Sequence, residues 1–322
     1  MISPPLIKPC PNGIYRPLWS VMIPVYNCSD LLSQTLQTVL LQDPGPALMQ
    51  IEVVDDASTD ADVKKLVEQI GKGRVSYFRQ PQNVGSLKNF ETCLNLAKGH
   101  LVHLLHGDDK VRIGYYGKIS SLFERFPSIG AAFCRYDTID ENGKVWWSHT
   151  IESKEEGILK DWLIQIAQKQ RLQFCTITVK REVYENLGGF YGVNYGEDWE
   201  MWTRIAAHYD VAYTPELLAD YRIHPNSISR QSFKNAQNIR DIKWVIDAIV
   251  KLVPGEKRGE VKRAAYKNYA HHALIIANNL WHQTKNKTIV HLQIKEALKM
   301  HIDLAMLFKT AKIYAKMIIN RV

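Results

Sequence analysis

The stretch 100–109 reads HLVHLLHGDD and is the part of the chain that most strongly decides its fold. An apolar run that ends in two carboxylates just after a glycine predicts a buried strand with Asp108 and Asp109 at its carboxyl end. Adjacent carboxylates repel, and each tends to take up a proton unless a cation lies between them. Mg²⁺ and Mn²⁺ prefer oxygen ligands and commonly hold substrate phosphates too. The alternative is that Asp109 only caps a helix over residues 111–126.

The apolar runs and helical patterns alternate along the first 110 residues. They predict strands over residues 19–25, 50–54 and 75–79, and helices over 29–42, from about 60 to 70, and over 85–98. This alternation predicts an α/β fold with a doubly wound, mostly parallel sheet. Ligands of such sheets bind at the carboxyl ends of the strands. The sequence therefore predicts one acidic crevice that contains Tyr26, Asp55, Asp56, Asp108 and Asp109.

The pattern changes after residue 127. We expect a hairpin of strands 129–136 and 145–148 with its turn at 141–144, and a further strand over 174–180. Short helices are expected over 161–167, 181–187 and 199–207, and long helices from residue 232 onward. We predict a catalytic domain over residues 1–230 and a basic helical region over residues 231–322.

Composition limits the class of protein. The 322 residues are 46% hydrophobic and 23% charged, which is typical of a globular protein with a core. Five cysteines without CxxC spacing argue against a disulfide framework and a zinc cluster, and indicate a reducing compartment. We see no signal peptide and no apolar stretch of transmembrane length, so we expect a cytoplasmic protein.

Charge is unevenly distributed. Residues 231–322 carry 17 Lys and Arg against 6 Asp and Glu, a net charge of +11, whereas residues 1–230 carry a net charge of −3. Near the end of the chain, Leu304, Leu307, Phe308 and Ile318 share one helical face, and Lys309, Lys312 and Lys316 lie on another. This pattern predicts a helix that either binds the anionic surface of a membrane, at the inner face of that membrane, or packs on the catalytic domain. No nucleic-acid reading motif accompanies the basic region, so we expect no nucleic acid.

Five motifs in order resemble those of the family 2 glycosyltransferases over about residues 18–230. They are VMIPVYN at 21–27, VVDDASTD at 53–60, NVG at 83–85, GDD at 107–109 and EDW at 197–199. The resemblance implies a GT-A fold, a nucleotide-diphosphate sugar donor, a divalent metal (Mg²⁺ or Mn²⁺) and transfer with inversion at the anomeric carbon.

The resemblance assigns the donor pocket. The loop along the nucleotide matches Pro24, Val25 and Tyr26, and the pair that accepts a hydrogen bond from the base imide matches Asp55 and Asp56, which favours a UDP- or dTDP-sugar. The alternatives are that Tyr26 is a core aromatic residue and that Asp56 or Ser58 caps the next helix.

Asn83 and Gly85 match the closure of this donor pocket. An Arg often follows the Gly in the family, whereas this chain has Lys88, which either neutralises diphosphate as a point charge or is a solvated helix residue.

The resemblance also assigns the metal and the chemistry. Asp108 would contact the ribose or the metal, Asp109 would bind the metal that bridges both phosphates, and His106 stands where the family often has another Asp, although a structural role is the alternative. His224, in the segment 221–229, would reach the metal or the diphosphate; the alternative is an ordinary loop residue.

The pair at 197–198 is assigned to the acceptor side. The base that deprotonates the acceptor hydroxyl matches Asp198, and a helix N-terminus is expected to keep this carboxylate ionised. Glu197 and Trp199 would also lie on the acceptor side, with Trp199 and Trp202 as a platform for a sugar ring. The alternatives are that both acids cap the helix and that Trp202 is a core residue.

The leading interpretation is an inverting glycosyltransferase that transfers a sugar to a glycan or lipid-linked acceptor in surface polysaccharide synthesis. The alternatives are a catalytically inactive nucleotide-sugar-binding protein and a metal-dependent nucleotidyltransferase. A pure binder has little need for the second acidic pair, and the loop 24–28 lacks the Gly and Lys expected of a nucleotidyltransferase.

Overall fold

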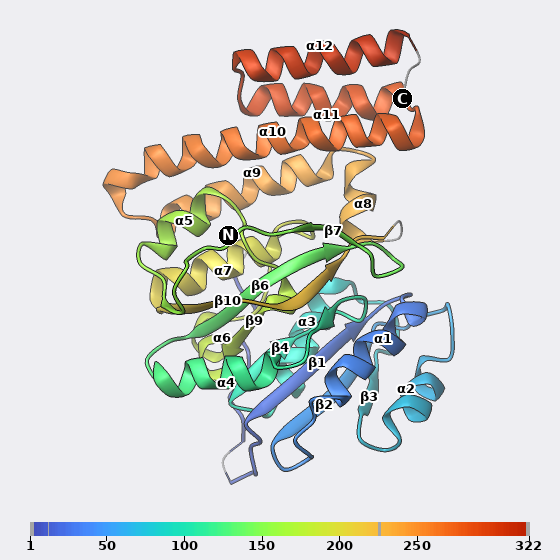
Figure 1. Cartoon of the computed structure of the whole chain (residues 1–322), viewed down its shortest axis with the longest axis vertical. Coiled ribbons are helices and arrows are strands. Elements are labelled where there is room, and N and C mark those ends of the chain that lie inside the picture. Colours follow the sequence, from blue (N-terminus) through green and yellow to red (C-terminus); the bar gives the residue numbers. More distant parts are fainter. Residues whose placement is uncertain (1–2, 12, 225–226, 320–322) are drawn as a thin grey trace. The chain divides into compact units, whose positions relative to one another are not determined.

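The structure is a computed structural model that describes residues 3–11, 13–224 and 227–319. The chain forms two compact units (Figure 1). The first consists of Met1–Lys160, Leu172–Gly192 and His208–His224, and the second of Asp161–Arg171, Val193–Ala207 and Pro225–Val322. Two short segments from the middle of the chain thus join the second unit. The functional boundary predicted at residue 230 stays a prediction.

The first unit contains a ten-stranded sheet in which eight strands have the order β3-β2-β1-β4-β9-β6-β10-β5, while β7 pairs with β6 and β8 pairs with β10. Its strands are β1 (Trp19–Val25), β2 (Met49–Asp55), β3 (Ser76–Arg79), β4 (Leu101–Leu104), β5 (Lys110–Val111), β6 (Ala131–Ile139), β7 (Val145–Ser148), β8 (Gly157–Ile158), β9 (Ile177–Lys180) and β10 (Val211–Arg222). Strands β3, β2, β1 and β4 are parallel neighbours, and the long pairing of β6 with β10 is parallel as well. The shorter pairings of β5, β7, β8 and β9 are antiparallel. The predicted α/β, mostly parallel sheet is confirmed.

Helices of the first unit cover the sheet. They are α1 (Ser29–Leu40), α2 (Val63–Gly71), α3 (Ser86–Leu96), α4 (Tyr115–Arg125) and α6 (Arg181–Leu187). Trp19, Val21, Ile23 and Val25 share one hydrophobic core with residues of α1, α2 and α4, while Met22, which points to the opposite face, is also buried. A strand buried on both faces favours apolar residues at successive positions, which explains the run in β1, where the buried Ser20 donates to Gln50 Oε1.

The segment that carries Asp109 differs from the expected one. Strand β4 ends at Leu104, a turn follows, and β5 begins directly after Asp109. Helix α4 begins only at Tyr115, behind Gly114, whose φ of +95° suits a glycine. Asp109 is therefore not the cap of this helix, and the capping alternative is wrong.

The later strands were only partly predicted. The segment expected as one strand over 174–180 begins as a 3-10 turn, η1 (Phe174–Thr176), before β9. Strands β5, β8 and β10 were not predicted. The hairpin of β6 and β7 forms as expected, and its turn contains Gly143 with a φ of +85°.

The second unit is helical among its described residues. Its helices are α5 (Trp162–Gln168), α7 (Glu197–His208, whose last residue belongs to the first unit), α8 (Ile228–Phe233), α9 (Gln237–Ile249), α10 (Arg258–Thr284), α11 (Lys287–Met300) and α12 (Leu304–Ile318), with short 3-10 turns η2 (Val250–Leu252) and η3 (Gly255–Lys257). The long helix α10 packs against α5, α9, α11 and α12. No helix in the described part of the chain combines the length and apolar character needed to cross a membrane.

Candidate active site

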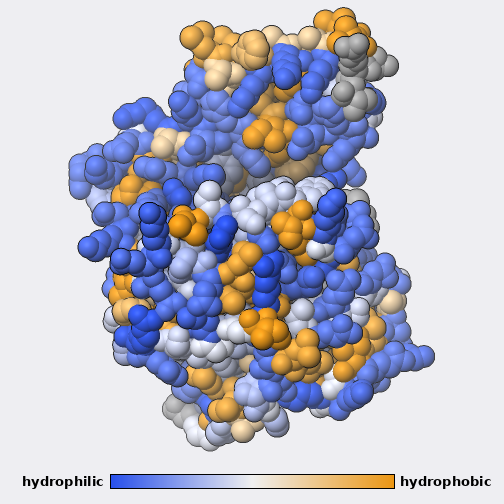
Figure 2. Space-filling view, in the orientation of Figure 1, coloured by the Kyte–Doolittle hydropathy of each residue, from blue (hydrophilic) through white to orange (hydrophobic). Residues whose placement is uncertain are grey.

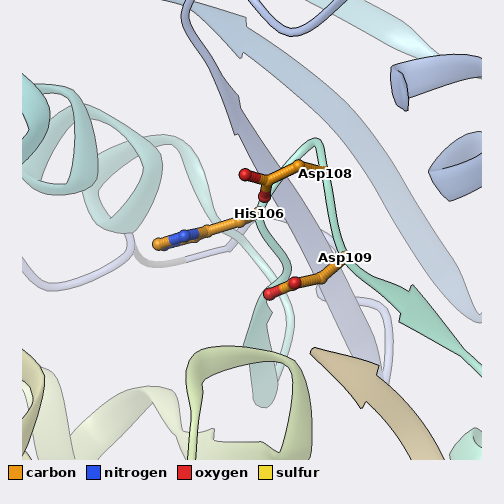
Figure 3. A group of neighbouring side chains, drawn as sticks. All are labelled: His106, Asp108 and Asp109. Carbon is orange, nitrogen blue, oxygen red and sulfur yellow. The ribbon is translucent and has the colours of Figure 1, made fainter. Parts of the chain in front are cut away.

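The turn between β4 and β5 brings three potential metal ligands together in the first unit. One ligand atom each from His106, Asp108 and Asp109 lies within 4.8 Å of the others, and Figure 3 shows the three side chains projecting from this turn. The turn approaches β1 so closely that a Cβ at Gly107 would lie 2.9 Å from a methyl group of Val25. The amide of Gly107 donates to the carbonyl of Pro24 at 3.2 Å. The glycine of the GDD motif therefore permits this close packing.

His106 combines a packing role with an unused ligand atom. Its ring lies 5.1 Å from the ring of Phe90 and 4.2 Å from that of Phe174, measured between centroids. Burial lowers its pKa, so the ring is neutral and able to ligate. Its Nε2 atom is buried and has no hydrogen-bond partner among the described residues. A buried polar atom of this kind favours a ligand, and the two carboxylates beside it fit a divalent ion.

The two carboxylates have different environments. Burial raises the pKa of Asp108, but the hydrogen bond with His224 and the nearby His106 bring it below its ordinary value. The Nε2 atom of His224 lies 2.9 Å from Asp108 Oδ2. Burial, followed by the charge of Asp108, raises the pKa of Asp109 well above its ordinary value. The pair thus shows the repulsion that a cation between the two groups would relieve.

Arg222, at the end of β10, holds this turn and had no predicted role. Its backbone N–H donates to Asp109 Oδ1 at 2.8 Å, and its Nε donates to the carbonyl of Asp108 at 2.7 Å. The guanidinium also donates to the carbonyls of Asp140 and Glu141 in the β6–β7 turn. The only sequence signal was its position two residues before His224. Pro225 and Asn226, which follow in the predicted segment, lie outside the described residues.

The predicted nucleotide loop follows β1. Pro24 and Val25 are the last residues of β1, so Pro24 lies within the strand and not in a turn after it. Tyr26 is 48% exposed, and the alternative that it is a core aromatic residue is wrong. The amide of Asp56 donates to the carbonyl of Val25 at 2.8 Å, which places the ends of β1 and β2 side by side.

Asp55 and Asp56 bind different neighbours. The buried carboxylate of Asp55 accepts from the amide of Ser58, from the Tyr77 hydroxyl at 2.6 Å and from Arg79. Asp56 accepts from the loop before α3, namely from Asn83 Nδ2 at 3.0 Å, the amide of Val84 at 2.7 Å and the amide of Gly85 at 3.0 Å. Neither Asp56 nor Ser58 caps α2, because the side chain of Asp62 does so. That capping alternative is wrong.

The loop before α3 therefore joins the predicted donor pocket through Asp56. Gly85 has a φ of +83°, and a Cβ there would meet nothing within 4 Å, so open space lies beside this backbone. Lys88 is exposed and pairs with Glu91 on the same helix, both oxygens lying 2.8 Å from its Nζ. This contact favours the solvated alternative for Lys88.

Glu197, Asp198 and Trp199 belong to the second unit. Asp198 accepts from the amide of Trp199 at 2.8 Å and from the side chain of Gln170. Burial raises the pKa of Asp198 to about 7 despite these bonds, and burial together with the charge of Asp198 raises the pKa of Glu197 to about 8. The pKa of Asp198 is thus raised and not lowered as expected of a carboxylate at a helix N-terminus, because desolvation outweighs that effect.

Trp199 is fully buried and its ring stacks on Tyr269 with centroids 4.6 Å apart. Its indole N–H donates to the carbonyl of Ile166 at 2.6 Å. The structure does not support a sugar platform made by Trp199, because the side chain is a core residue of the second unit. Trp202 is buried as well, as its alternative stated.

Comparison with known proteins identifies the family. Residues 20–189, more than half of the chain, match the family model described as Glycosyl transferase family 2. The chain is a member of the glycosyl transferase family 2. It is 28% identical over 228 residues to the putative teichuronic acid biosynthesis glycosyltransferase TuaG of Bacillus subtilis, covering 69% of this chain and 86% of TuaG. Three uncharacterized mycoplasma glycosyltransferases match over shorter stretches, and the chain covers only 39% to 41% of their length.

Solved structures show the fold. S. aureus TarS 1–349 in complex with UDP-GlcNAc superposes with a TM-score of 0.65 at 15% identity, over 87% of this chain and 79% of TarS. The mannosyltransferase PcManGT from Pyrobaculum calidifontis, in complex with GDP-Man and Mn²⁺, gives a TM-score of 0.53 at 18% identity, over 98% and 92%. The predicted GT-A fold with a C-terminal helical extension is confirmed.

Proposed function

We propose that this glycosyltransferase inverts the anomeric centre as it transfers a sugar from a nucleotide diphosphate to a glycan or lipid-linked acceptor in surface polysaccharide synthesis. The observation that carries the proposal is the grouping of His106, Asp108 and Asp109 within 4.8 Å, beside β1 in the parallel half of the sheet. The family membership argues against the nucleotidyltransferase alternative. An inactive nucleotide-sugar-binding protein remains the competing hypothesis, and turnover distinguishes the two.

The donor site is proposed in the first unit. We place the nucleotide along Pro24, Val25 and Tyr26, with the ring of Tyr26 available to the base or ribose because it is exposed. Asp56 is proposed to accept a hydrogen bond from the imide of a uracil or thymine base. Asp55 is proposed to hold the end of β2 in position through its bonds with Tyr77 and Arg79. Asn83 and Gly85 are proposed to close the pocket. Lys88 is proposed to approach the diphosphate after its bond with Glu91 is released.

We propose that Asp108, Asp109 and His106 hold a divalent ion, Mg²⁺ or Mn²⁺. His224, bonded to Asp108, is placed at the same ion or at the diphosphate. The bound ion would supply positive charge that offsets the charge of the departing nucleoside diphosphate. The mannosyltransferase of the same fold was solved with Mn²⁺, which is consistent with this donor set.

Asp198 is proposed to accept the proton of the acceptor hydroxyl, with Glu197 beside it on the acceptor side. A general base works best when its pKa lies near the working pH, and burial brings that of Asp198 to about 7. The carboxylate of Asp198 can accept the N–H of Trp199 and also accept a proton from a substrate. The contact with Trp199 at the start of α7 therefore does not argue against a catalytic role.

The test of this function is a donor-hydrolysis screen. Purified protein is incubated with UDP-, dTDP- and GDP-sugars in Mg²⁺, Mn²⁺ or EDTA, and released nucleotide is measured. We expect hydrolysis of a UDP- or dTDP-sugar that requires the metal. Nucleotide binding without any turnover, in the screen and with acceptor glycans present, would favour the inactive binder.

Transfer should depend on pH through the acidic pair. Because burial raises the pKa of Asp198 to about 7 and that of Glu197 to about 8, the base is protonated and inactive at low pH. We expect kcat/KM to rise between about pH 6 and pH 8, with apparent values that belong to the coupled pair. A pH-rate profile that is flat over this interval would contradict the assignment of the base.

We further propose that α12 attaches the protein to the inner face of the cytoplasmic membrane. Met306, Ile313 and Met317 face the rest of the second unit, whereas Leu304, Phe308 and Ile318 are 86%, 74% and 81% exposed. Figure 2 shows hydrophobic residues gathered along α12 at the top of the view. The face of α12 with Leu304, Phe308 and Ile318, which was expected either to bind a membrane or to pack on the protein, is thus exposed. The helix packs through the face that carries Met306, Ile313 and Met317.

The lysines of α12 make its membrane binding sensitive to charge. Each basic residue near an anionic surface contributes about 1 kcal/mol. Changing Lys309 and Lys312 to Glu should release the protein from vesicles that contain anionic lipid, measured by co-sedimentation at low salt. Lys316 is left unchanged because it bonds to both Asn278 and His282 within the unit, whereas Lys309 makes one longer contact there, with His271 Nδ1 at 3.3 Å.

Two comparisons make this experiment specific. The control Lys64→Glu with Lys65→Glu makes the same charge change on α2 and should keep vesicle binding. Leu304→Ser with Phe308→Ser should weaken binding without any change of charge. If the wild type ignores such vesicles at low salt and instead forms dimers, the exposed face is a subunit interface and membrane attachment is wrong.

A further inference from the structure

Strand β7 exposes two consecutive tryptophans in the first unit. Trp146 is 49% exposed and Trp147 is 45% exposed. Their ring centroids lie 6.1 Å apart with 34° between the ring planes, so the indoles present one continuous aromatic surface. Indole rings are large hydrophobic groups, and a cluster of them at a protein surface marks a binding site more often than chance.

The position of Trp147 is fixed by its neighbours. Its indole N–H donates to His149 Nε2 at 2.8 Å. The imidazole of His149 in turn stacks on Tyr136, with centroids 3.8 Å apart and 19° between the planes. A side chain held in this way loses little conformational entropy when a ligand binds, which is typical of residues that are built for recognition.

The same hairpin is fastened to the proposed metal turn. Arg222 donates through Nη1 to the carbonyls of Asp140 and Glu141, at 3.1 and 2.8 Å, and through Nε to the carbonyl of Asp108. All of these residues belong to the first unit. The aromatic surface therefore stands on a hairpin whose turn is bonded to the donor side of the site.

The composition of the turn, of β7 and of the segment after it indicates the kind of ligand. Residues 140–155 contain four Asp and Glu against two Lys, whereas α12 contains three Lys and no acidic residue. A segment with this balance lacks the excess of basic residues that binds anionic lipid or nucleic acid. Its carboxylates accept hydrogen bonds from hydroxyl groups, and its indoles cover the apolar C–H faces of a sugar ring. Neutral sugar rings fit this combination better than phosphate-bearing surfaces do.

We propose that Trp146 and Trp147 bind sugar rings of a neutral glycan acceptor. The proposal rests on the proposed function for the role of that glycan as an acceptor, but the binding itself is measurable without turnover. It would make β7 a determinant of acceptor affinity that is separate from the acidic residues of α7.

The test compares glycan binding by four proteins on an array of neutral and anionic oligosaccharides, with UDP and Mn²⁺ present. Trp146→Ala with Trp147→Ala should weaken binding of neutral glycans at least about 10-fold, because a tryptophan that becomes buried when its ligand binds commonly dominates the binding energy. Trp146→Tyr with Trp147→Tyr should retain most of the binding, because aromatic faces remain. Tyr15→Ala, at another exposed aromatic residue of the first unit, should match the wild type.

Donor hydrolysis separates this proposal from the proposed function. The alanine pair should hydrolyse donor like the wild type and should raise the KM for acceptor with little change in kcat. If the wild type binds no neutral glycan, or if the alanine pair binds as well as the wild type, the proposal is overturned. Loss of vesicle binding alone in the alanine pair would overturn it in favour of a membrane contact. Absence of all donor turnover would reject the proposed function while leaving tryptophan-dependent glycan binding measurable.

Discussion

Replacing Asp198 with Asn should lower the transfer rate by about 10²–10⁴-fold while donor affinity stays unchanged. Asn keeps an oxygen that can accept the N–H of Trp199, so the change removes the charge and the proton acceptor but retains the contact at the start of α7. The measurement is kcat with an identified acceptor, together with nucleotide affinity by calorimetry. Asp247→Asn, on the exposed part of α9, is the matched control and should transfer normally.

Stability distinguishes catalysis from helix capping in this variant. Folding raises the pKa of Asp198 to about 7, so its contribution to stability is fully present below its unfolded pKa of about 4 and is lost as the pH rises through 7. The Asn variant should therefore be at least as stable as the wild type at pH 8. A lower melting temperature at pH 8 with near-normal turnover would assign Asp198 to capping and remove it from the mechanism.

Asp109→Asn should abolish the metal-dependent part of nucleotide binding. Loss of groups that only support a metal ligand costs about 10–100-fold in metal affinity, so loss of a ligand should cost about 100-fold or more. Asn retains an Oδ1 atom that can accept the N–H of Arg222, so the turn keeps its backbone contact. Calorimetry of UDP binding in Mn²⁺ and in EDTA gives the metal-dependent part directly.

The control for this change is Asp62→Asn, which removes one negative charge at the start of α2, where Asn also serves as a cap. It should bind UDP and Mn²⁺ like the wild type. An Asp109→Asn variant whose UDP affinity still responds to Mn²⁺ as the wild type does would refute the metal assignment. Equal affinities in Mn²⁺ and EDTA for the wild type would refute it as well.

The half of the fold that carries the proposed donor site was predictable from the sequence because its signals are local. Strand β1 is buried on both faces and is apolar except at Ser20, whereas β2 alternates apolar and polar residues before Val53. Each strand is followed by or ends in polar residues, which parallel strands bring to one edge. Strand β10 was missed although it is long. Two irregularities near Glu216 interrupt its pairing with β6, and its burial pattern depends on partners far away in the sequence.

The site was predictable as a set of residues but not as a set of contacts. The motifs gave Asp56, Asp108 and Asp109, whereas the role of Arg222 depends on the pairing of β10 with β6 and could not be read from spacing. The pKa of Asp198 was predicted with the wrong sign, because the helix N-terminus is visible in the sequence and the burial of a charge is not. Trp199 was placed on a surface for the same reason, since α7 carries apolar and acidic residues side by side.

The single guanidinium of Arg222 has a consequence for how the two substrates affect each other's binding. One side chain bonds both to the turn that would meet the nucleotide and to the hairpin that would meet the acceptor. A nucleotide that shifts the first set of bonds can act on the second through this one side chain. Because coupling between two binding equilibria is reciprocal, the factor by which nucleotide changes acceptor affinity equals the factor by which acceptor changes nucleotide affinity. If the nucleotide steadies the hairpin, each substrate should bind more tightly when the other is present, and replacing Arg222 should weaken both effects together.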